Sequence, residues 1–380
     1  MSNIDTRAIE AINVSKRRNL LSPRPLAITV RADQRQTSAQ LARDHCVEVT
    51  EFLAANHLSS ADAALPHERF LILPYEARLP HESRLALAAS GDAEIEPVLR
   101  HIKLTYTYQF AGRKFFVGTL LNRQVVATVT GGGLVNASIG TTTLLNNFRV
   151  ERLLFMGIAG SIEKLSVGDV CVPSLILQHD LGTWFDQEGI AQEHGSLLWQ
   201  SNGIWVWSND GRREQVGLKP DLDWVSQVAE RMKKMQDTDL DLSPNSGVRK
   251  GIFTRACISA SGSQFVLGHD AQVRLRQIAE LARVRDPSVD TEDGLIVNQE
   301  DIAFAVAAEE NATPWIIIRI VVDTGQPSRT KRRLPATINT SEEGWAWLES
   351  LNEVPVANWK FLYEKLGAFV IEVLNHETNS

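Results

Sequence analysis

The stretch around residue 300 constrains the fold of this chain more than any other, because it joins a helix to a nearly apolar strand. Apolar side chains within residues 302–307 recur at helical spacing, and Pro314 marks the end of that helix. Residues 315–322 are nearly all apolar and rich in β-branched side chains, as is typical of a strand buried on both faces. Helices must then cover both faces of the sheet, so the stretch predicts an α/β fold.

Two carboxylates lie where predicted strands end. Glu300 follows a short apolar strand at residues 295–297, and Asp323 follows the strand at residues 315–322. In open α/β sheets, ligands bind beyond the carboxyl ends of the strands, so both side chains are candidates for one binding site. The alternative makes Glu300 an acid at a helix N-terminus and Asp323 a turn residue, and these two residues alone do not decide between the interpretations.

Composition and charge narrow the possible functions. The chain has 380 residues, 43% hydrophobic and 22% charged, which is an ordinary globular profile, and its net charge of −7 argues against general binding of nucleic acid. Its three cysteines are far apart, which predicts free thiols rather than a disulfide framework or a metal site. Because no apolar run is long enough for a signal peptide or a membrane span, we expect a cytoplasmic protein with no membrane partner.

Acidic and glycine-rich turns follow several predicted strands. Residues 84–90 predict a strand, and the acidic turn at residues 91–96 either caps the next helix or supplies a general base. A second small-residue turn, residues 157–161, follows another predicted strand. The glycine-rich turn that begins at Gly131 fails the dinucleotide-binding fingerprint, because Asn136 occupies the place of the third glycine. We therefore expect no cofactor.

The pattern of predicted strands, helices and turns divides the chain into two parts. Residues 1–83 predict an N-terminal extension of unknown role, with one helix at residues 37–56. Residues 84–380 form the main domain, in which strands, helices and glycine turns alternate as they do around a central mixed sheet. A polar, tryptophan-rich insertion occupies about residues 183–248 of this domain and contains one helix, at residues 222–235.

Five motifs follow one another in the main domain. They are a glycine turn at residues 131–142, Ala159-Gly160 with residues 167–172, the pair His179-Asp180, the loop at residues 261–265, and a segment carrying Val297, Glu300, Pro314, Arg319 and Asp323. In this order and spacing the motifs resemble the nucleoside phosphorylase and nucleosidase superfamily, nearest to the branch that hydrolyses methylthioadenosine and S-adenosylhomocysteine. The resemblance implies a three-layer α/β sandwich, with a central mixed β-sheet flanked by helices.

The resemblance also implies hydrolysis of the N-ribosidic bond of a purine, with adenine expected, to give the free base and ribose or ribose phosphate. Asp323 would protonate the departing purine, and Glu96 in the acidic turn would be the base that activates water. Glu300 would accept the ribose hydroxyls, and Phe265 would stack on the base. The other residues implied to contact substrate are Val266, Ala159, Gly160 and Gln299.

The acidic turn favours hydrolysis over phosphorolysis. Similar phosphorylases hold phosphate with an arginine in this turn, whereas this chain offers carboxylates, which repel phosphate. A phosphate-dependent purine nucleoside phosphorylase remains an alternative, as does a sensor or interaction module on an enzyme-like fold. The module is favoured by the loss of a serine and a methionine that the nucleosidases carry at Val322 and Ala93, and it is disfavoured by the retention of the three acids Glu96, Glu300 and Asp323. A Glu-Met pair of the nucleosidases is also replaced, by Asn298-Gln299.

The loop after Asp323 bears on the 5′ end of the substrate. Arg332 and Arg333 close a basic run at residues 329–333, which is either a solvated loop or a clamp for a 5′-phosphate. We expect the partner to be a small-molecule nucleoside or nucleotide. The resemblance adds the expectation of a homo-oligomer.

Overall fold

The chain forms two compact units in a computed structural model. One unit holds the residues up to His81 together with Leu104–Lys114, and the other holds Glu82–Lys103 and Phe115–Ser380. The residues that the structure describes are 28–32, 35–65, 69–74, 77–185, 198–201, 203–208, 211–235, 253–264, 266, 269–287, 294–324 and 359–377.

The smaller unit has an antiparallel sheet in the order β4–β1–β2, with two short helices in its described part. Its elements are β1 (Thr29–Ala32), α2 (Ser38–Asp44), α3 (Val49–Asn56), β2 (Leu71–Ile72) and β4 (Lys103–Phe110). The single helix predicted at residues 37–56 is wrong, because the chain turns at Cys46, whose φ of 54° is left-handed. The His45 ring is buried beside this turn, 2.8 Å from the Tyr108 hydroxyl.

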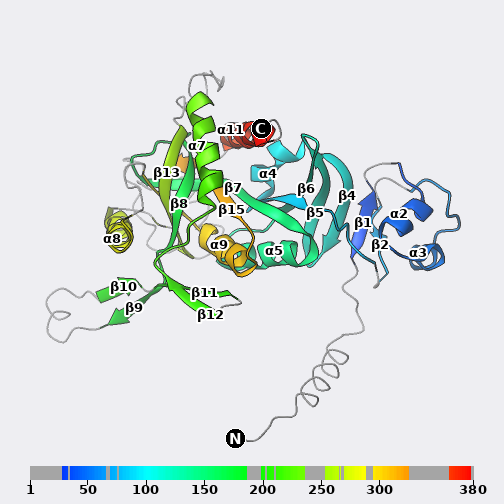
Figure 1. The fold of residues 1–380 in the computed structure, drawn as a ribbon, viewed down its shortest axis with the longest axis horizontal. Coiled ribbons are helices and arrows are strands. Elements are labelled where there is room, and N and C mark those ends of the chain that lie inside the picture. Colours follow the sequence, from blue (N-terminus) through cyan, green and yellow to red (C-terminus); the bar gives the residue numbers. More distant parts are fainter. Residues whose placement is uncertain are drawn as a thin grey trace, which may run out of the picture. The chain divides into compact units, whose positions relative to one another are not determined.

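The larger unit is built on a mixed sheet, as predicted (Figure 1). Its strand order is β14–β13–β8–β15–β7–β3–β6–β5. β15 runs parallel to β7 and antiparallel to β8, while β3 runs parallel to both of its neighbours. These strands are β3 (Arg84–Ala89), β5 (Arg113–Leu120), β6 (Arg123–Val129), β7 (Val150–Glu163), β8 (Val170–Gln178), β13 (Phe253–Ser261), β14 (Leu295–Asn298) and β15 (Trp315–Asp323).

The long strand β7 closes part of this sheet into a ring. Its early residues pair with β3 and β15, and its last residues, from Gly160 to Glu163, pair antiparallel with β14. β14 also pairs with β13, so β7, β15, β8, β13 and β14 join in a closed circuit. The predicted mixed sheet between helices is confirmed, but it curls instead of forming a flat middle layer.

The turn predicted at residues 157–161 is wrong, because β7 runs on through these residues to Glu163. Gly157 and Gly160 remain in the ladder with β15, opposite Arg319 and Asp323 respectively. Small residues here serve close packing rather than a change of direction, since a side chain at either glycine would collide with a charged group of the site.

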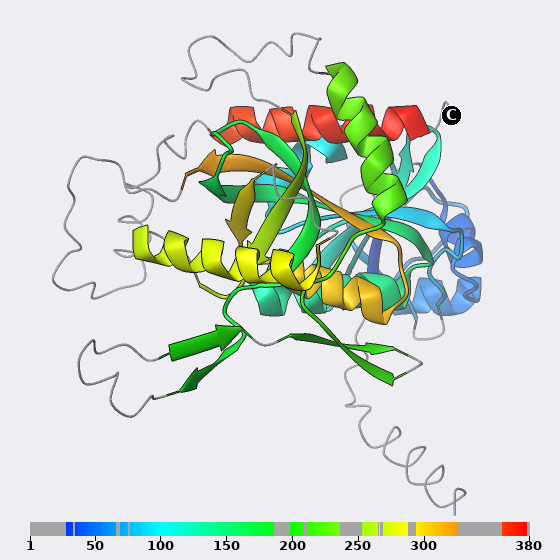
Figure 2. The ribbon, with the colours of Figure 1, turned by 60° about the vertical axis from the view of Figure 1, so that its left-hand side comes forward.

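Helices flank the sheet in two pairs (Figures 1 and 2). α4 packs against α11, α5 packs against α9, and both views place the two pairs on opposite sides of the sheet. The helices of this unit are α4 (Asp92–Leu99), α5 (Leu134–Asn147), α7 (Leu222–Met235), α8 (His269–Arg285), α9 (Asp301–Glu310) and α11 (Trp359–Glu377). Within the described residues, none of the helices combines the length and apolar character needed to span a membrane.

The described part of the insertion contains two antiparallel hairpins before α7. β9 (Gly182–Phe185) pairs with β10 (Leu198–Ser201), and β11 (Ile204–Ser208) pairs with β12 (Gly211–Gln215). The second hairpin lies against α9, where the backbone N–H of Trp207 donates to Glu310. The helix predicted at residues 222–235 is confirmed as α7.

The core centres on β15. Every residue from Trp315 to Val322 is at most 2% exposed, which confirms the prediction of a strand buried on both faces. Arg319 shares this burial, with no exposed surface, although it carries a charge. A buried charge needs compensating partners, so the surroundings of Arg319 lead directly to the site.

Candidate active site

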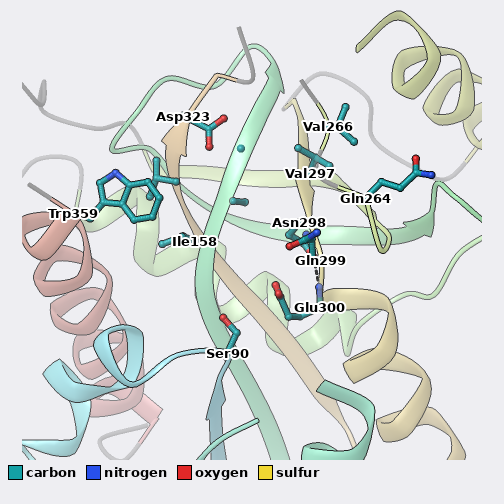
Figure 3. Close-up of a pocket in the computed structure, with 13 residues that line it drawn as sticks. Ser90, Ile158, Gln264, Val266, Val297, Asn298, Gln299, Glu300, Asp323 and Trp359 are labelled. Carbon is teal, nitrogen blue, oxygen red and sulfur yellow. Dashed lines mark hydrogen bonds between the residues drawn. The ribbon is translucent and has the colours of Figure 1, made fainter. Parts of the chain in front are cut away.

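A pocket of about 220 Å³ opens where β3, β14 and β15 end, beside the part of β7 that passes them (Figure 3). Carboxyl ends of strands are the usual place for ligands in α/β proteins. Figure 3 shows Asp323 at one end of the pocket and Glu300 with Ser90 at the other. The lining residues are Ser90, Ile158, Ala159, Gly160, Gln264, Val266, Val297, Asn298, Gln299, Glu300, Val322, Asp323 and Trp359.

Two glycines of β7 make room for the charged groups. A Cβ added at Gly160 would lie 2.9 Å from Asp323 Oδ1. A Cβ added at Gly157 would lie 2.3 Å from Arg319 Nη1 and 2.7 Å from Glu94 Oε1. All three separations are shorter than any normal contact, so the glycines let the strand pass directly beside the side chains of the site.

Glu300 joins the start of α9 to the glycine turn before α5. It is 8% exposed and lines the pocket. Its Oε1 accepts a hydrogen bond of 3.0 Å from the backbone N–H of Gly133, and its Oε2 accepts one of 3.3 Å from Arg319 Nη2. Gly133 has a φ of 82°, which glycine adopts without strain. Each carboxylate oxygen keeps acceptor capacity for a hydroxyl in the pocket.

Arg319 is the cation at the centre of the site. Its Nε donates to Asp301 Oδ1 at 2.8 Å, its Nη1 to the Ile158 carbonyl at 2.9 Å, and its Nη2 to both Asp301 and Glu300. Burial alone lowers the pKa of Arg319, but the charges of Asp301, Glu300 and Glu94 outweigh burial and raise it. The guanidinium is therefore a permanent charge that binds three pieces of the site together.

Glu94, on the first turn of α4, is the second buried carboxylate of the site, with 3% exposure. Its Oε2 accepts from Ser90 Oγ at 2.5 Å and from the Gly91 N–H at 2.8 Å, and its Oε1 accepts from the Ile158 N–H at 2.9 Å. Burial raises the pKa of Glu94, although Arg319 and the hydrogen bonds from Ser90 and Ile158 act in the opposite direction. A carboxylate with a raised pKa is suited to general acid or base chemistry.

Glu96 is exposed on the outer face of α4 and does not line the pocket. The prediction that Glu96 lies in the site is therefore corrected, and Glu94 is the acid of this turn that contacts pocket residues. Residues two apart point to nearly opposite sides of a helix, so only one of these two acids can face inward. The sequence contained the signal, because Glu94 shares a helix face with buried Val98, four residues later.

Asp323 ends β15 and is half-buried, with its carboxyl group against Gly160. Across the pocket, the segment after β13 brings Gln264 and Val266 to the lining. Asp180 anchors that segment, because it accepts 2.5 Å hydrogen bonds from both the backbone N–H and the hydroxyl of Ser263. Of the His179-Asp180 pair in the sequence, Asp180 thus fixes the segment that supplies one wall of the pocket.

Most of the predicted contact residues meet in this pocket. Glu300 and Asp323 line it together with Val266, Ala159, Gly160 and Gln299. The predicted residues Phe265, Arg332 and Arg333 lie outside the described part of the chain. Sequence reasoning missed Ser90, Gln264 and Trp359, whose residue types carry no signal until the fold brings them together. Among the described residues, no cluster of three metal-ligating side chains occurs.

A family model described as the phosphorylase superfamily matches residues 84–343. A 5′-methylthioadenosine/S-adenosylhomocysteine nucleosidase of Staphylococcus epidermidis is 35% identical over 97 residues, which are 25% of this chain and 42% of that protein. The protein of the same name from Staphylococcus aureus is 36% identical over 110 residues, 28% of this chain and 46% of that protein. The chain thus matches less than half the length of these relatives.

Solved structures show the same fold at low sequence identity. A futalosine hydrolase of Helicobacter pylori has a TM-score of 0.50 and 15% identity, over 77% of this chain and 98% of that one. An S-adenosylhomocysteine nucleosidase of Streptococcus pyogenes, in complex with 5-methylthiotubericidin, has a TM-score of 0.50 and 16% identity, over 78% and 98%. The alignment therefore covers nearly the whole of each solved structure.

Proposed function

The chain belongs to the phosphorylase superfamily, and on that premise we propose that it hydrolyses the N-ribosidic bond of an adenine nucleoside. The observation that carries the proposal is a set of three carboxylates: Glu300 and Asp323 line one small pocket, and the buried Glu94 lies behind it, hydrogen-bonded to the lining residues Ser90 and Ile158. Two curated relatives are named as nucleosidases of 5′-methylthioadenosine and S-adenosylhomocysteine, which supports a purine nucleoside as the substrate.

The three carboxylates divide the chemistry among them. Asp323 gives a proton to the departing purine, so that a neutral base leaves instead of an anion. Glu300 accepts hydrogen bonds from the ribose hydroxyls and stabilises the positive charge that grows on the sugar ring in an oxocarbenium-like transition state. Glu94 takes the proton of the attacking water, and its raised pKa makes it a stronger base than an ordinary carboxylate.

The charges of the pocket favour water over phosphate as the nucleophile. None of the described lining residues is a lysine or an arginine, while Glu300 and Asp323 are both acids. The nearby cation, Arg319, directs its N–H groups to Asp301, Glu300 and the Ile158 carbonyl. A phosphate ion entering this pocket would meet the Glu300 carboxylate and no cation among the described lining residues, whereas water needs only a base.

The 5′-phosphate predicted from Arg332 and Arg333 stays a prediction, because both arginines lie outside the described residues. The described lining supplies no lysine or arginine for such a phosphate, and Trp359 and Val322 add apolar surface to the pocket. We therefore propose a nucleoside with an uncharged 5′ group, and a 5′-nucleotide is the competing substrate in the test.

The test incubates the purified protein with adenosine, 5′-methylthioadenosine and AMP, each with and without phosphate, and separates the products by chromatography. We expect adenine and a free pentose, formed at the same rate whether or not phosphate is present. Release of adenine only with phosphate, with a pentose 1-phosphate as product, would show a phosphorylase. No release of base from any of the three would contradict the proposed activity. A higher kcat/KM for AMP would establish the 5′-phosphate.

We also propose that the chain forms a homo-oligomer through the outer face of α5 and α9. Val135 is 71% exposed and Ile139 is 50% exposed, one turn apart on α5, beside a groove lined by Ile302, Ala303 and Val306. A largely apolar exposed surface of this kind is typical of an interface. We expect Val135→Asp with Ile139→Asp to lower the mass measured by light scattering to that of one chain. A wild-type protein that is already monomeric would refute this assembly.

A further inference from the structure

Asp301 is a fully buried carboxylate, one residue beyond Glu300, for which the proposed reaction has no direct use. Its Oδ1 accepts two hydrogen bonds from Arg319, one of them 2.8 Å from Nε. Its Oδ2 accepts from Ser259 Oγ at 2.6 Å and from Asn298 Nδ2 at 2.7 Å. Four donors for one carboxylate form a fully satisfied arrangement that suits an ionised side chain.

Asn298 fixes this arrangement relative to the helix that follows. Its Oδ1 accepts from the backbone N–H groups of Glu300 at 3.1 Å and of Asp301 at 2.9 Å. Because the amide oxygen is committed to these donors, the Nδ2 group faces the other way, toward Asp301 and Ser259. The start of α9, which carries Glu300, is thereby tied to the carboxylate that holds Arg319.

The electrostatic environment of Glu94 depends on how far the partners of Arg319 neutralise its positive charge. Arg319 on β15 and Glu300 before α9 face Glu94, and Tyr363 faces it from α11. Burial and the Glu94 charge raise the pKa of Tyr363 to about 12, so the phenol stays neutral in the working range of pH. Near Glu94, the charge that favours its ionised form is therefore that of Arg319, which Asp301 partly neutralises.

We propose that Asp301 is a positioning residue for the proposed hydrolysis. Asp301 holds Arg319 against Glu300, and it neutralises enough of the charge of Arg319 to keep Glu94 an effective base. The proposal rests on the proposed function. It has two separable parts, since the charge of Asp301 acts on Glu94, whereas its geometry places the guanidinium that contacts Glu300.

The test compares the pH dependence of kcat/KM in Asp301→Asn, Asp301→Glu and Ser259→Ala with that of the wild type. Asp301→Asn removes the charge at nearly constant volume, so Arg319 acts more strongly on Glu94 and the pKa of Glu94 falls. The acid limb of the profile, where the base becomes protonated, should then move to lower pH by roughly one unit, and the plateau should fall about tenfold. Ser259→Ala removes one hydrogen bond to Asp301 and one from Asn298 but no charge, and its acid limb should stay in place.

Asp301→Glu keeps the charge but displaces the guanidinium, so we expect an unmoved acid limb with kcat lowered by about tenfold. An unchanged limb in folded Asp301→Asn, or an equal shift in Ser259→Ala, would overturn the proposal. If Asp301→Asn does not fold, wild-type kinetics in Asp301→Glu would overturn it instead. A wild-type protein that releases no base shows that the proposed function has failed, which is a different outcome from an active enzyme insensitive to Asp301.

Discussion

Replacing Asp323 with asparagine is expected to lower kcat/KM for adenine release by about 10²–10⁴-fold while the fold survives. The amide has almost the same shape as the carboxyl group, so the close contact with Gly160, where a Cβ would come within 2.9 Å of Oδ1, is retained. It still donates a hydrogen bond but cannot transfer a proton, so the purine must leave with its negative charge uncompensated. The measurement is the initial rate of adenine release across a range of substrate concentrations.

A second substrate separates acid catalysis from damage to binding. In a 4-nitrophenyl riboside the leaving group is stable as an anion and needs no proton, so Asp323→Asn should hydrolyse it within a few-fold of the wild type. If both substrates lose rate equally, Asp323 contributes to the shape of the pocket and is not the proton donor. Unchanged adenine release in Asp323→Asn would remove Asp323 from the reaction altogether.

The position of Asp323 could be predicted from the sequence because its cause is local. A run of apolar, β-branched residues from Trp315 onward has one stable environment, the centre of a sheet, and the first polar residue after it must lie at the strand's end. The same reasoning places Glu300 at the end of β14 and the start of α9. β14 and β15 both pair with β7, and this brings both acids to one pocket.

The interior of the pocket could not be predicted in the same way, because it depends on contacts between residues that are far apart in the sequence. The run from Gly157 to Ser161 resembles a turn, and only the pairing of β7 with both β15 and β14 keeps it extended. The Arg319 network joins parts of the chain that lie more than 200 residues apart, from Glu94 to Arg319, so no spacing reveals it. Glu94 is a different case, because helical periodicity on α4 separates it from Glu96.

That separation leads to a matched pair of variants, Glu94→Gln and Glu96→Gln. Glu94 is buried among Ser90, Gly91 and Ile158, and as glutamine it cannot accept a proton from water. We expect Glu94→Gln to lower kcat/KM by about 10²–10⁴-fold, with both adenine and nitrophenyl leaving groups, since water must be activated in either case. Glu96→Gln alters an exposed side chain and should stay within about twofold of the wild type.

The stability of the same variants supplies a readout that does not depend on activity. Burial raises the pKa of Glu94, so the folded protein binds this proton more tightly than the unfolded chain does. The contribution of Glu94 to the free energy of unfolding is therefore complete below its unfolded pKa and is lost as pH rises through the folded pKa. Glutamine does not titrate, so the Tm of Glu94→Gln minus that of the wild type should grow with pH across this window. Parallel Tm curves for the two proteins, or a rate loss in Glu96→Gln that matches that of Glu94→Gln, would contradict the assignment of the base to Glu94.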